Sequence, residues 1–391
     1  MIYLDNSATT KQYPQVTEIM VKCMEEDFGN PSSLYQLGVD SEKILKEARK
    51  NITCGADYRA VFTSGGTEAD NMAVLGTAKA MKRSGNRIVT TAVEHPAVLE
   101  CCKRLEQQGF DVVKAGVDRN CRLDMDQLRE AINDETILVT VMHVNNEAGT
   151  IMPIREIKEV MAAKKAPGLL HCDAVQSFGK LPLPQDADLI SLSGHKIYGP
   201  KGSGALLIRN GKGPSGKKID VPPFIIGGGQ ESGMRSGTEN VAAIAGIGKA
   251  AEIITKSRKA EMERIGSLRE LLRRTLTEEL EDIVINSPEE IGEEPGMCCP
   301  VLLSVTFRGT RGEVLLHTLE QDGIYVSTGS ACSSNKKGQS HVLQAMGLSD
   351  KDIEGTIRFS LGRYNTEEDI LFAAEKTIEA VKRFRRLGSF R

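Results

Sequence analysis

In the first half of the chain, short apolar runs rich in β-branched residues alternate with longer stretches whose apolar positions recur at helical spacing. The short runs cover residues 60–63, 87–91, 136–142, 169–172 and 188–192. This alternation predicts an α/β fold built on a largely parallel sheet. A glycine-rich turn at 199–204 precedes apolar residues 205–208, which predicts one further strand joined to that sheet as a hairpin.

The second half of the chain predicts a long helix followed by a smaller unit. Residues 211–223 are rich in Gly, Pro and Lys and predict a surface loop, and a helical pattern then covers residues 238–280. Beyond it, strand patterns alternate with helices that begin near Gly312 and Thr366, the latter with Asp369 in a capping box. We expect a helix of this length to connect a large domain to a smaller one.

The length of the chain, 391 residues, fits two or three domains. We predict a large domain at residues 14–257 and a smaller α+β domain that consists of residues 1–13 and 258–391. The formal net charge is −3, from 50 basic and 53 acidic residues, which excludes a globally basic surface that attracts nucleic acid.

Two further features bear on where the protein works. No apolar run approaches the ~20 residues of a membrane helix, and the first residues show neither the basic segment nor the apolar core of a signal peptide. We therefore expect a cytoplasmic protein without a membrane span and without direct DNA binding.

The cysteines do not form a recognisable framework. Their number is odd and no C-x-x-C spacing occurs, so neither a disulfide scaffold nor a structural zinc site fits, and we expect no metal site. Most of them should be small buried hydrophobes, with one or two chemically active. The nine positions are 23, 54, 101, 102, 121, 172, 298, 299 and 332.

Small and polar residues follow the predicted strand at 60–63. The sequence from Ser64 to Ala69, Ser-Gly-Gly-Thr-Glu-Ala, opens a helical stretch. Small residues let a ligand approach the backbone, and the free N–H groups of a helix start bind anions. The spacing matches neither a dinucleotide fingerprint nor a Walker loop. This segment predicts a phosphate site, although Thr67 could equally be a helix N-cap.

Other predicted strands also end in polar residues. His95, Asn146, Asp173 and Lys196 each follow one closely. Taken singly, His95 could merely precede a helix, Asp173 could be a cap, and Lys196 could be a solvated cation. Together they converge on one sheet edge, where ligands of α/β proteins bind. A lysine, an aspartate and an anion-binding helix start meet the needs of pyridoxal 5′-phosphate (PLP), its aldehyde, ring nitrogen and phosphate respectively.

Five blocks of the sequence carry a family resemblance: residues 3–10, 29–33, 63–71, 193–202 and 234–238. Through them the chain closely resembles the NifS/IscS-like cysteine desulfurases of the class-V aminotransferase family. The Gly-Ser-Ala-Cys block that ends at Cys332 distinguishes desulfurases from plain aminotransferases. The resemblance implies a fold-type I PLP-dependent transferase, with a mainly parallel, seven-stranded large domain and a smaller α+β domain that carries the Cys332 loop.

Carried to matching positions, the resemblance assigns the site. Lys196 would bind PLP covalently, His95 would stack on its ring, Asp173 would face its ring nitrogen, and Gln176 would contact its phenolic oxygen. The phosphate would be held by Gly66, Thr67, Ser193 and His195, together with Thr238 of a second subunit. Asn146 and Arg358 would bind the substrate carboxylate. The catalytic set is Cys332, Lys196 and His95.

Arg358 and Cys332 also have a basis in the sequence pattern. Alternation along 356–360 puts Arg358 on the polar face of a strand, where its guanidinium suits a carboxylate. The alternative is a surface strand arginine. Cys332 stands among small polar residues of a predicted loop, which suits an accessible nucleophile, whereas the alternative is an inert loop cysteine.

The predicted reaction converts L-cysteine to L-alanine and leaves the sulfur as a persulfide on Cys332 of a homodimer. The rivals are a selenocysteine lyase or class-V aminotransferase, and a non-catalytic binder that retains the fold. Ser232 stands where many relatives have arginine, and residues 335–339 depart from the IscS pattern. The Lys336–Lys337 pair and the basic segment at 382–391 favour an acceptor of the tRNA 4-thiouridine synthase type over an iron–sulfur scaffold. The alternative is that these cations are simply solvated.

Overall fold

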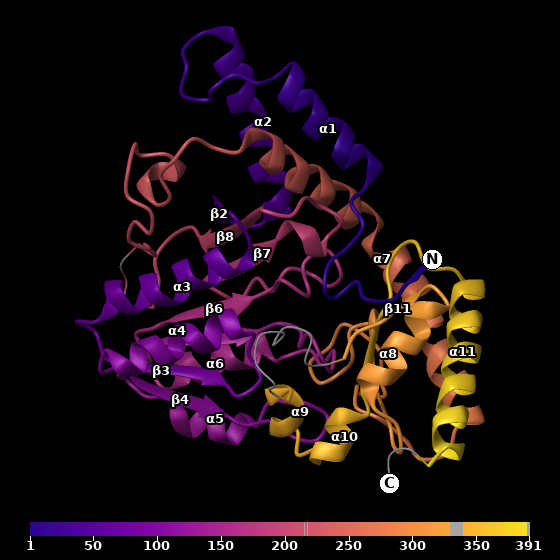
Figure 1. The fold of residues 1–391 in the computed structure, drawn as a ribbon. Helices are drawn as coiled ribbons and strands as arrows, with labels where there is room; N and C mark the ends of the chain where they lie inside the picture. Colours follow the sequence, from indigo (N-terminus) through magenta and orange to yellow (C-terminus); the bar gives the residue numbers. More distant parts are fainter. Residues whose placement is uncertain (215, 217, 329–338, 389–391) are drawn as a thin grey trace.

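The computed structural model describes residues 1–214, 216, 218–328 and 339–388. A seven-stranded sheet with the order β2-β8-β7-β6-β5-β3-β4 forms its larger part (Figure 1). Its strands are β2 Tyr58–Thr63, β3 Arg87–Thr91, β4 Asp111–Ala115, β5 Thr136–Met142, β6 Leu169–Asp173, β7 Leu189–Ser193 and β8 Gly204–Arg209. Strand β8 points in the opposite direction to the others and pairs antiparallel with β2 and β7, and the remaining pairs are parallel. The predicted mainly parallel sheet and its hairpin strand are confirmed.

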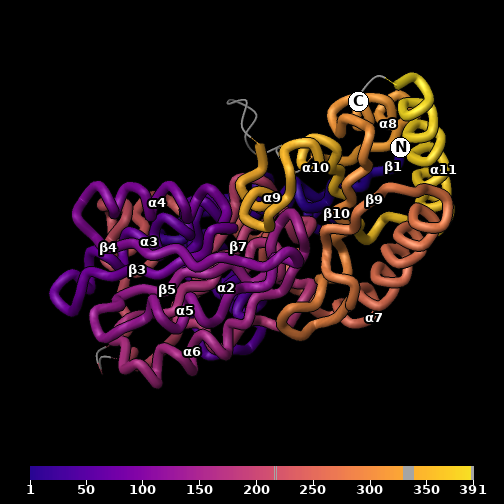
Figure 2. Tube along the Cα trace, turned by 90° about the horizontal axis from the view of Figure 1, so that it is seen from below, coloured from indigo at the N-terminus to yellow at the C-terminus, as the bar shows by residue number. Residues whose placement is uncertain are grey.

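Helices cover both faces of this sheet, with α3 and α4 on one side and α5 and α6 on the other (Figure 2). Every residue of β5, β6 and β7 is buried, as expected for central parallel strands that are covered on both faces. The helices of this part are α1 Pro14–Glu25, α2 Gln36–Thr53, α3 Gly66–Met81, α4 Pro96–Gln107, α5 Met125–Ala131 and α6 Ile154–Ala163.

The long helix α7, Val241–Glu279, runs from the sheet to a second hydrophobic core. That core lies around an antiparallel sheet of β9 Ile283–Ile285, β10 Leu302–Phe307 and β12 Thr356–Ser360. The helices α8 Gly312–Gln321 and α11 Glu367–Arg386 pack on this core, whereas the short helices α9 His341–Ala345 and α10 Asp350–Glu354 place their buried residues in the core of the larger part. The predicted capping box of Thr366 and Asp369 begins α11. The predicted division at 257/258 falls inside α7 and stays a prediction.

The N-terminal segment joins the two parts of the molecule. Its strand β1 Ile2–Tyr3 pairs with β11 Ile324–Tyr325, and the Asn6 N–H donates to the Ser360 carbonyl over 3.1 Å. A few residues later the Thr10 N–H donates to the His195 carbonyl, 2.9 Å away in the large part. Residues 4–10 therefore cross from the second core to the edge of the seven-stranded sheet.

No helix within the described ranges is both long and apolar enough to cross a membrane. The eight cysteines that the structure describes are all free thiols.

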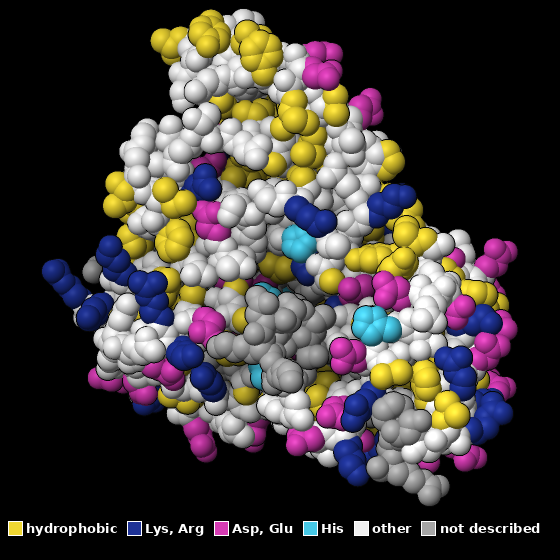
Figure 3. Space-filling model, viewed as in Figure 1, with side chains coloured by type: hydrophobic (Ala, Val, Ile, Leu, Met, Phe, Trp, Pro, Cys, Tyr) yellow, Lys and Arg dark blue, Asp and Glu magenta, His cyan; other side chains and the backbone are white. Residues whose placement is uncertain are grey.

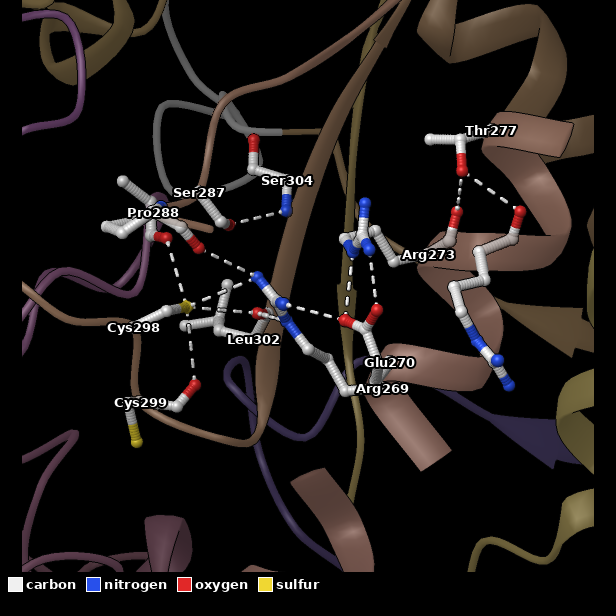
Figure 4. Close-up of polar contacts among 12 residues, drawn as sticks. Arg269, Glu270, Arg273, Thr277, Ser287, Pro288, Cys298, Cys299, Leu302 and Ser304 are labelled. Atoms are coloured by element: carbon white, nitrogen blue, oxygen red, sulfur yellow. Dashed lines mark hydrogen bonds and ion pairs between the residues drawn. The ribbon is translucent and has the colours of Figure 1, made fainter. Parts of the chain in front are cut away.

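A fully buried arginine ties α7 to the segment that precedes β10 (Figure 4). Arg269 donates from Nε to the Leu302 carbonyl over 3.0 Å and from Nη2 to the Pro288 carbonyl over 3.2 Å. Its Nη2 also lies 3.6 Å from the Cys298 Sγ. The neighbouring Cys299 N–H donates to the Gly149 carbonyl over 2.8 Å. Arg269 therefore supports the loop after β5 through the cysteine pair.

We expect Arg269→Met to lower the free energy of unfolding by about 3 kcal/mol, because it leaves buried carbonyl acceptors unpaired. Urea unfolding measures this loss. Arg273→Met is the matched control on the same helix, because Arg273 forms a partly exposed ion pair with Glu270 and should cost less than about 1 kcal/mol. Equal losses in the two variants would contradict the structural role of Arg269.

Candidate active site

A cavity of about 270 Å³ lies at the carboxyl ends of β5, β6 and β7, beside the start of α3. The sequence prediction and the cavity lining share ten residues: Gly66, Thr67, His95, Asn146, Asp173, Gln176, Ser193, His195, Lys196 and Arg358. Thr238 is not among the lining residues and is exposed. Cys332 lies outside the described residues.

Lys196 ends a short 3-10 helix, Gly194–Lys196, that follows β7 directly. Its Nζ donates to the carbonyl oxygens of Ser7 and, over 2.8 Å, of Ala8. Sequence reasoning predicted the lysine but assigned no role to these two carbonyls, although residues 3–10 carried part of the family resemblance. The N-terminal segment thus orients the one lysine that lines the cavity among the described residues.

Three buried carboxyl groups lie together at the carboxyl end of the sheet. Asp173, Asp70 and Glu94 are all buried, and one oxygen each of Asp70 and Glu94 has no hydrogen-bond partner. Burial raises the pKa of Asp173 to about 6 and of Glu94 to about 8, and it raises the pKa of Asp70 well above its usual range. A cationic N–H group would relieve this imbalance.

The histidines of the site do not supply that positive charge. Burial, followed by the positive charge of Lys196, lowers the pKa of both His95 and His195 to about 4. His171, beneath the site on β6, has its pKa lowered by burial to about 3. Its ring nitrogens contact the hydroxyls of Thr140 at 2.8 Å and Ser191 at 2.9 Å. These imidazoles are therefore neutral at pH 7.

His95 serves two purposes at once. Its Nδ1 accepts the Ala97 N–H over 3.2 Å and caps α4. His95 therefore does precede a helix, as the alternative from the sequence stated. Because Nδ1 is an acceptor, the proton of the neutral ring resides on Nε2. His95 lines the cavity and can present a flat, uncharged ring there.

The opposite end of the cavity suits an anion. The sixteen-residue helix α3 begins at Gly66, and Gly65, not Thr67, occupies its N-cap position. The alternative that Thr67 is the cap is therefore wrong. A Cβ on Gly66 would lie 2.7 Å from a methyl group of Val175, so this close approach requires glycine. Ser193 and His195 line the same cavity, and the start of a helix favours a phosphate.

Arg358 of β12 is buried, which excludes the alternative of a surface strand arginine. Its Nη2 pairs with Asp5 Oδ1 at 2.8 Å, and its Nη1 donates to the Asn146 carbonyl over 2.9 Å. Its Nε has no hydrogen-bond partner. Sequence reasoning missed Asp5. The guanidinium is thus fixed on two sides and retains donors for a carboxylate.

Both described ends of the segment around Cys332 are attached next to the cavity. Ser327 exchanges backbone hydrogen bonds with Arg358, of 3.2 and 2.7 Å. On the far side of residues 329–338, the Ser340 hydroxyl donates to the buried Glu147 carboxyl over 2.5 Å, and His341 Nε2 contacts the Glu94 carbonyl oxygen at 2.9 Å. The chain therefore leaves and returns at the cavity.

The residues present fit PLP. Lys196 supplies an amine, Asp173 an acid that favours a protonated ring nitrogen, and the start of α3 a phosphate cradle. Unpaired buried oxygens of Asp70 and Glu94 lie in the same acidic cluster. No group of three or more potential metal ligands occurs among the residues that the structure describes.

Comparisons with known proteins identify the family of this chain. The family model for aminotransferase class-V matches residues 2–372. The cysteine desulfurase IscS of Methanosarcina thermophila is 44% identical, over 99% of this chain and 93% of that protein. The IscS of Clostridium botulinum is 41% identical, over 99% of this chain and 96% of that protein.

Solved structures give the same result. A NifS-like protein superposes with a TM-score of 0.87 at 34% identity, over 97% of this chain and 99% of that chain. A NifS-like protein from Rickettsia africae has a TM-score of 0.83 at 30% identity, over 99% of both chains. The predicted fold-type I architecture is therefore confirmed, as is the dependence on PLP. This chain belongs to the class-V aminotransferase family and, within it, to the IscS- and NifS-like cysteine desulfurases.

Proposed function

We propose that this desulfurase converts L-cysteine to L-alanine in the cavity beside Lys196 and collects the sulfur as a persulfide on Cys332. Two observations, taken together, support this proposal. Lys196, Asp173 and Arg358 line one cavity, and the described residues on both sides of the Cys332 segment are attached beside it.

Each end of the cavity has a proposed role in holding PLP. Gly66, Thr67, Ser193 and His195 bind its phosphate, and Asp173 faces its ring nitrogen. The neutral ring of His95 stacks on the ring of PLP, and Gln176 contacts the phenolic oxygen of PLP. When bound, PLP supplies an aldehyde that binds amines and a ring that accepts electrons from the substrate carbon.

The protein groups then handle the substrate. Arg358 and Asn146 bind the carboxylate, and Lys196 Nζ, oriented by the Ser7 and Ala8 carbonyls, takes the proton from Cα. The Cys332 thiolate attacks the substrate sulfur, so a sulfur–sulfur bond forms and the carbon–sulfur bond breaks. The electrons of the broken bond remain with the carbon fragment, which takes up protons and leaves as L-alanine.

A homodimer accounts for the position of Thr238. This residue is exposed and does not line the cavity of its own chain, and we propose that it reaches the phosphate of the partner. Arg235, in the same block, is fixed to Glu68 of α3 at 2.9 Å. Exposed hydrophobic side chains gather over the α1–α2 connection (Figure 3), among them Phe28 and Leu34. A second copy of the chain would cover such a surface.

The sulfur acceptor we propose is of the tRNA 4-thiouridine synthase type, in the cytoplasm. Two cations of the basic segment at 382–391 already have partners within the described residues. Lys382 pairs with Glu279 at 2.9 Å, and Arg385 donates to three carbonyl oxygens, including that of Arg308. Both side chains thus have structural partners. Lys336 and Lys337, outside the described residues, remain the cations next to Cys332 in the sequence.

Cys332→Ser should abolish sulfide release from L-cysteine with a reductant present, by at least about 100-fold, because the nucleophile is lost. Binding of L-cysteine, followed through the absorbance of the bound PLP, should persist because Lys196, Asp173 and Arg358 are intact. Cys54→Ser, at an exposed cysteine far along the chain, is the matched control and should retain full activity. Normal sulfide release by Cys332→Ser would support the lyase or aminotransferase alternatives instead.

The acceptor is tested by transfer of labelled sulfur from the loaded enzyme to a purified thiouridine synthase and to an iron–sulfur scaffold in parallel. We expect faster transfer to the synthase, falling as salt rises and as Lys336 and Lys337 are changed to Gln, because exposed charges steer association. Faster transfer to the scaffold, insensitive to both lysines, would contradict this acceptor and leave the desulfurase reaction unaffected.

A further inference from the structure

A buried lysine lies directly behind the cavity. Lys180, in the turn that follows β6, is 5% exposed, and it does not line the cavity itself. Its Nζ donates to the side-chain oxygen of Gln176 over 3.3 Å. Within the described ranges it forms no ion pair with a carboxylate.

A buried ammonium group without a carboxylate partner is energetically unfavourable. Removing a charge from water costs several kcal/mol unless a partner offsets it, and a methionine would fill the same space without that cost. The charged and titratable groups that face Lys180 are the Cys299 thiol and the Arg358 guanidinium, and its field also reaches His195. Of these, only the weakly acidic thiol could become a counter-charge.

The contact with Gln176 fixes the direction of an amide. Gln176 donates from Nε2 to the Ser7 carbonyl over 3.0 Å and accepts from Lys180 on Oε1. An amide held in this way has one N–H left over, and Gln176 lines the cavity. A donor on the carbonyl side of an amide also polarises it and strengthens its N–H groups as donors.

We propose that Lys180 is a positioning residue for PLP, whose buried ammonium acts through Gln176 to hold and strengthen the N–H that this amide presents to the cavity. The inference rests on the proposed contact between Gln176 and the phenolic oxygen. Burial lowers the pKa of Lys180 to about 8, so the ammonium is mostly charged at pH 7 and loses its charge above pH 8.

The test measures how the visible absorbance of the PLP-loaded protein depends on pH. A donor to the phenolic oxygen, and positive potential behind it, both disfavour protonation of the bound cofactor. We therefore expect Lys180→Met to move the midpoint of the absorbance change to higher pH by about one unit. Lys180→Arg should stay within about 0.3 unit of the parent. Lys201→Met is the matched control at an exposed lysine near His195 and should also leave the midpoint in place, because water screens its charge.

The second arm asks whether Lys180 acts through Gln176. Gln176→Leu should also raise the midpoint, and the double variant should shift it no further than the larger single change. If Gln176→Leu leaves the midpoint unchanged, the proposed contact of Gln176 with PLP is wrong. If Gln176→Leu raises it and Lys180→Met does not, the role of Lys180 is wrong. Shifts that add in the double variant would also overturn it.

A third measurement does not require Lys180→Met to fold. In Gln176→Glu the new carboxylate gains Lys180 as an ion-pair partner, so its melting temperature should equal or exceed that of Gln176→Leu. A melting temperature well below that of Gln176→Leu would mean that the new carboxylate is buried without a cation, and it would contradict the contact between Lys180 and residue 176.

Discussion

The site depends on negative charge that the fold buries at the carboxyl edge of a parallel sheet. Asp173 ends β6, Glu94 follows β3, and Asp70 comes from the first turns of α3, so the strand order and the packing of α3 together bring three buried carboxyls to this edge of the sheet. The imidazoles around them are neutral, because burial lowers the pKa of each. Burial raises the pKa of Glu94 to about 8, so this acid retains its proton at pH 7, and it raises the pKa of Asp173 to about 6, so this acid carries its negative charge at a cost in free energy. A cofactor with a basic ring nitrogen turns this cost of folding into binding energy.

The second core completes what the sheet edge begins. Arg358 comes from β12, and Asp5 comes from the N-terminal segment that pairs with the same small sheet. The Ser7 and Ala8 carbonyls from that segment orient Lys196. On the other side, Arg269 and the cysteine pair support the loop that presents Asn146. Packing between the two cores therefore sets the distance between Lys196 and Arg358 across the cavity.

Sequence reasoning identified residues whose side chains stand immediately after a strand, because a polar group there has few structural explanations. Asp173 and Lys196 are such cases, whereas Arg358 was assigned from the family resemblance, with which the alternation along β12 agrees. The sequence could not indicate Ser7 and Ala8, because these residues act through backbone carbonyls, which every residue possesses. Asp5 acts by pairing with a strand more than 350 positions away.

Two further residues were missed for different reasons. Asp70 stands within a helical pattern, where an acid normally faces water, and only the tertiary fold shows that its carboxyl is buried. Lys180 lies in a turn between a strand and an apolar segment, where the sequence pattern predicts a lysine exposed to solvent. Burial is a tertiary property in both cases, and periodicity over a few residues does not encode it.

The most direct test of the charge-based account is the dissociation constant of PLP for the cofactor-free protein with Asp173 changed to Asn. Asparagine has nearly the same shape as aspartate but cannot carry the negative charge. A charge-assisted hydrogen bond to a buried group contributes about 1.5–3 kcal/mol, so we predict that PLP binds this variant about 10- to 100-fold more weakly at pH 7. The cofactor-free variant should be at least as stable as the parent, because it no longer buries an acid. Equal PLP affinity in the two proteins would contradict the account.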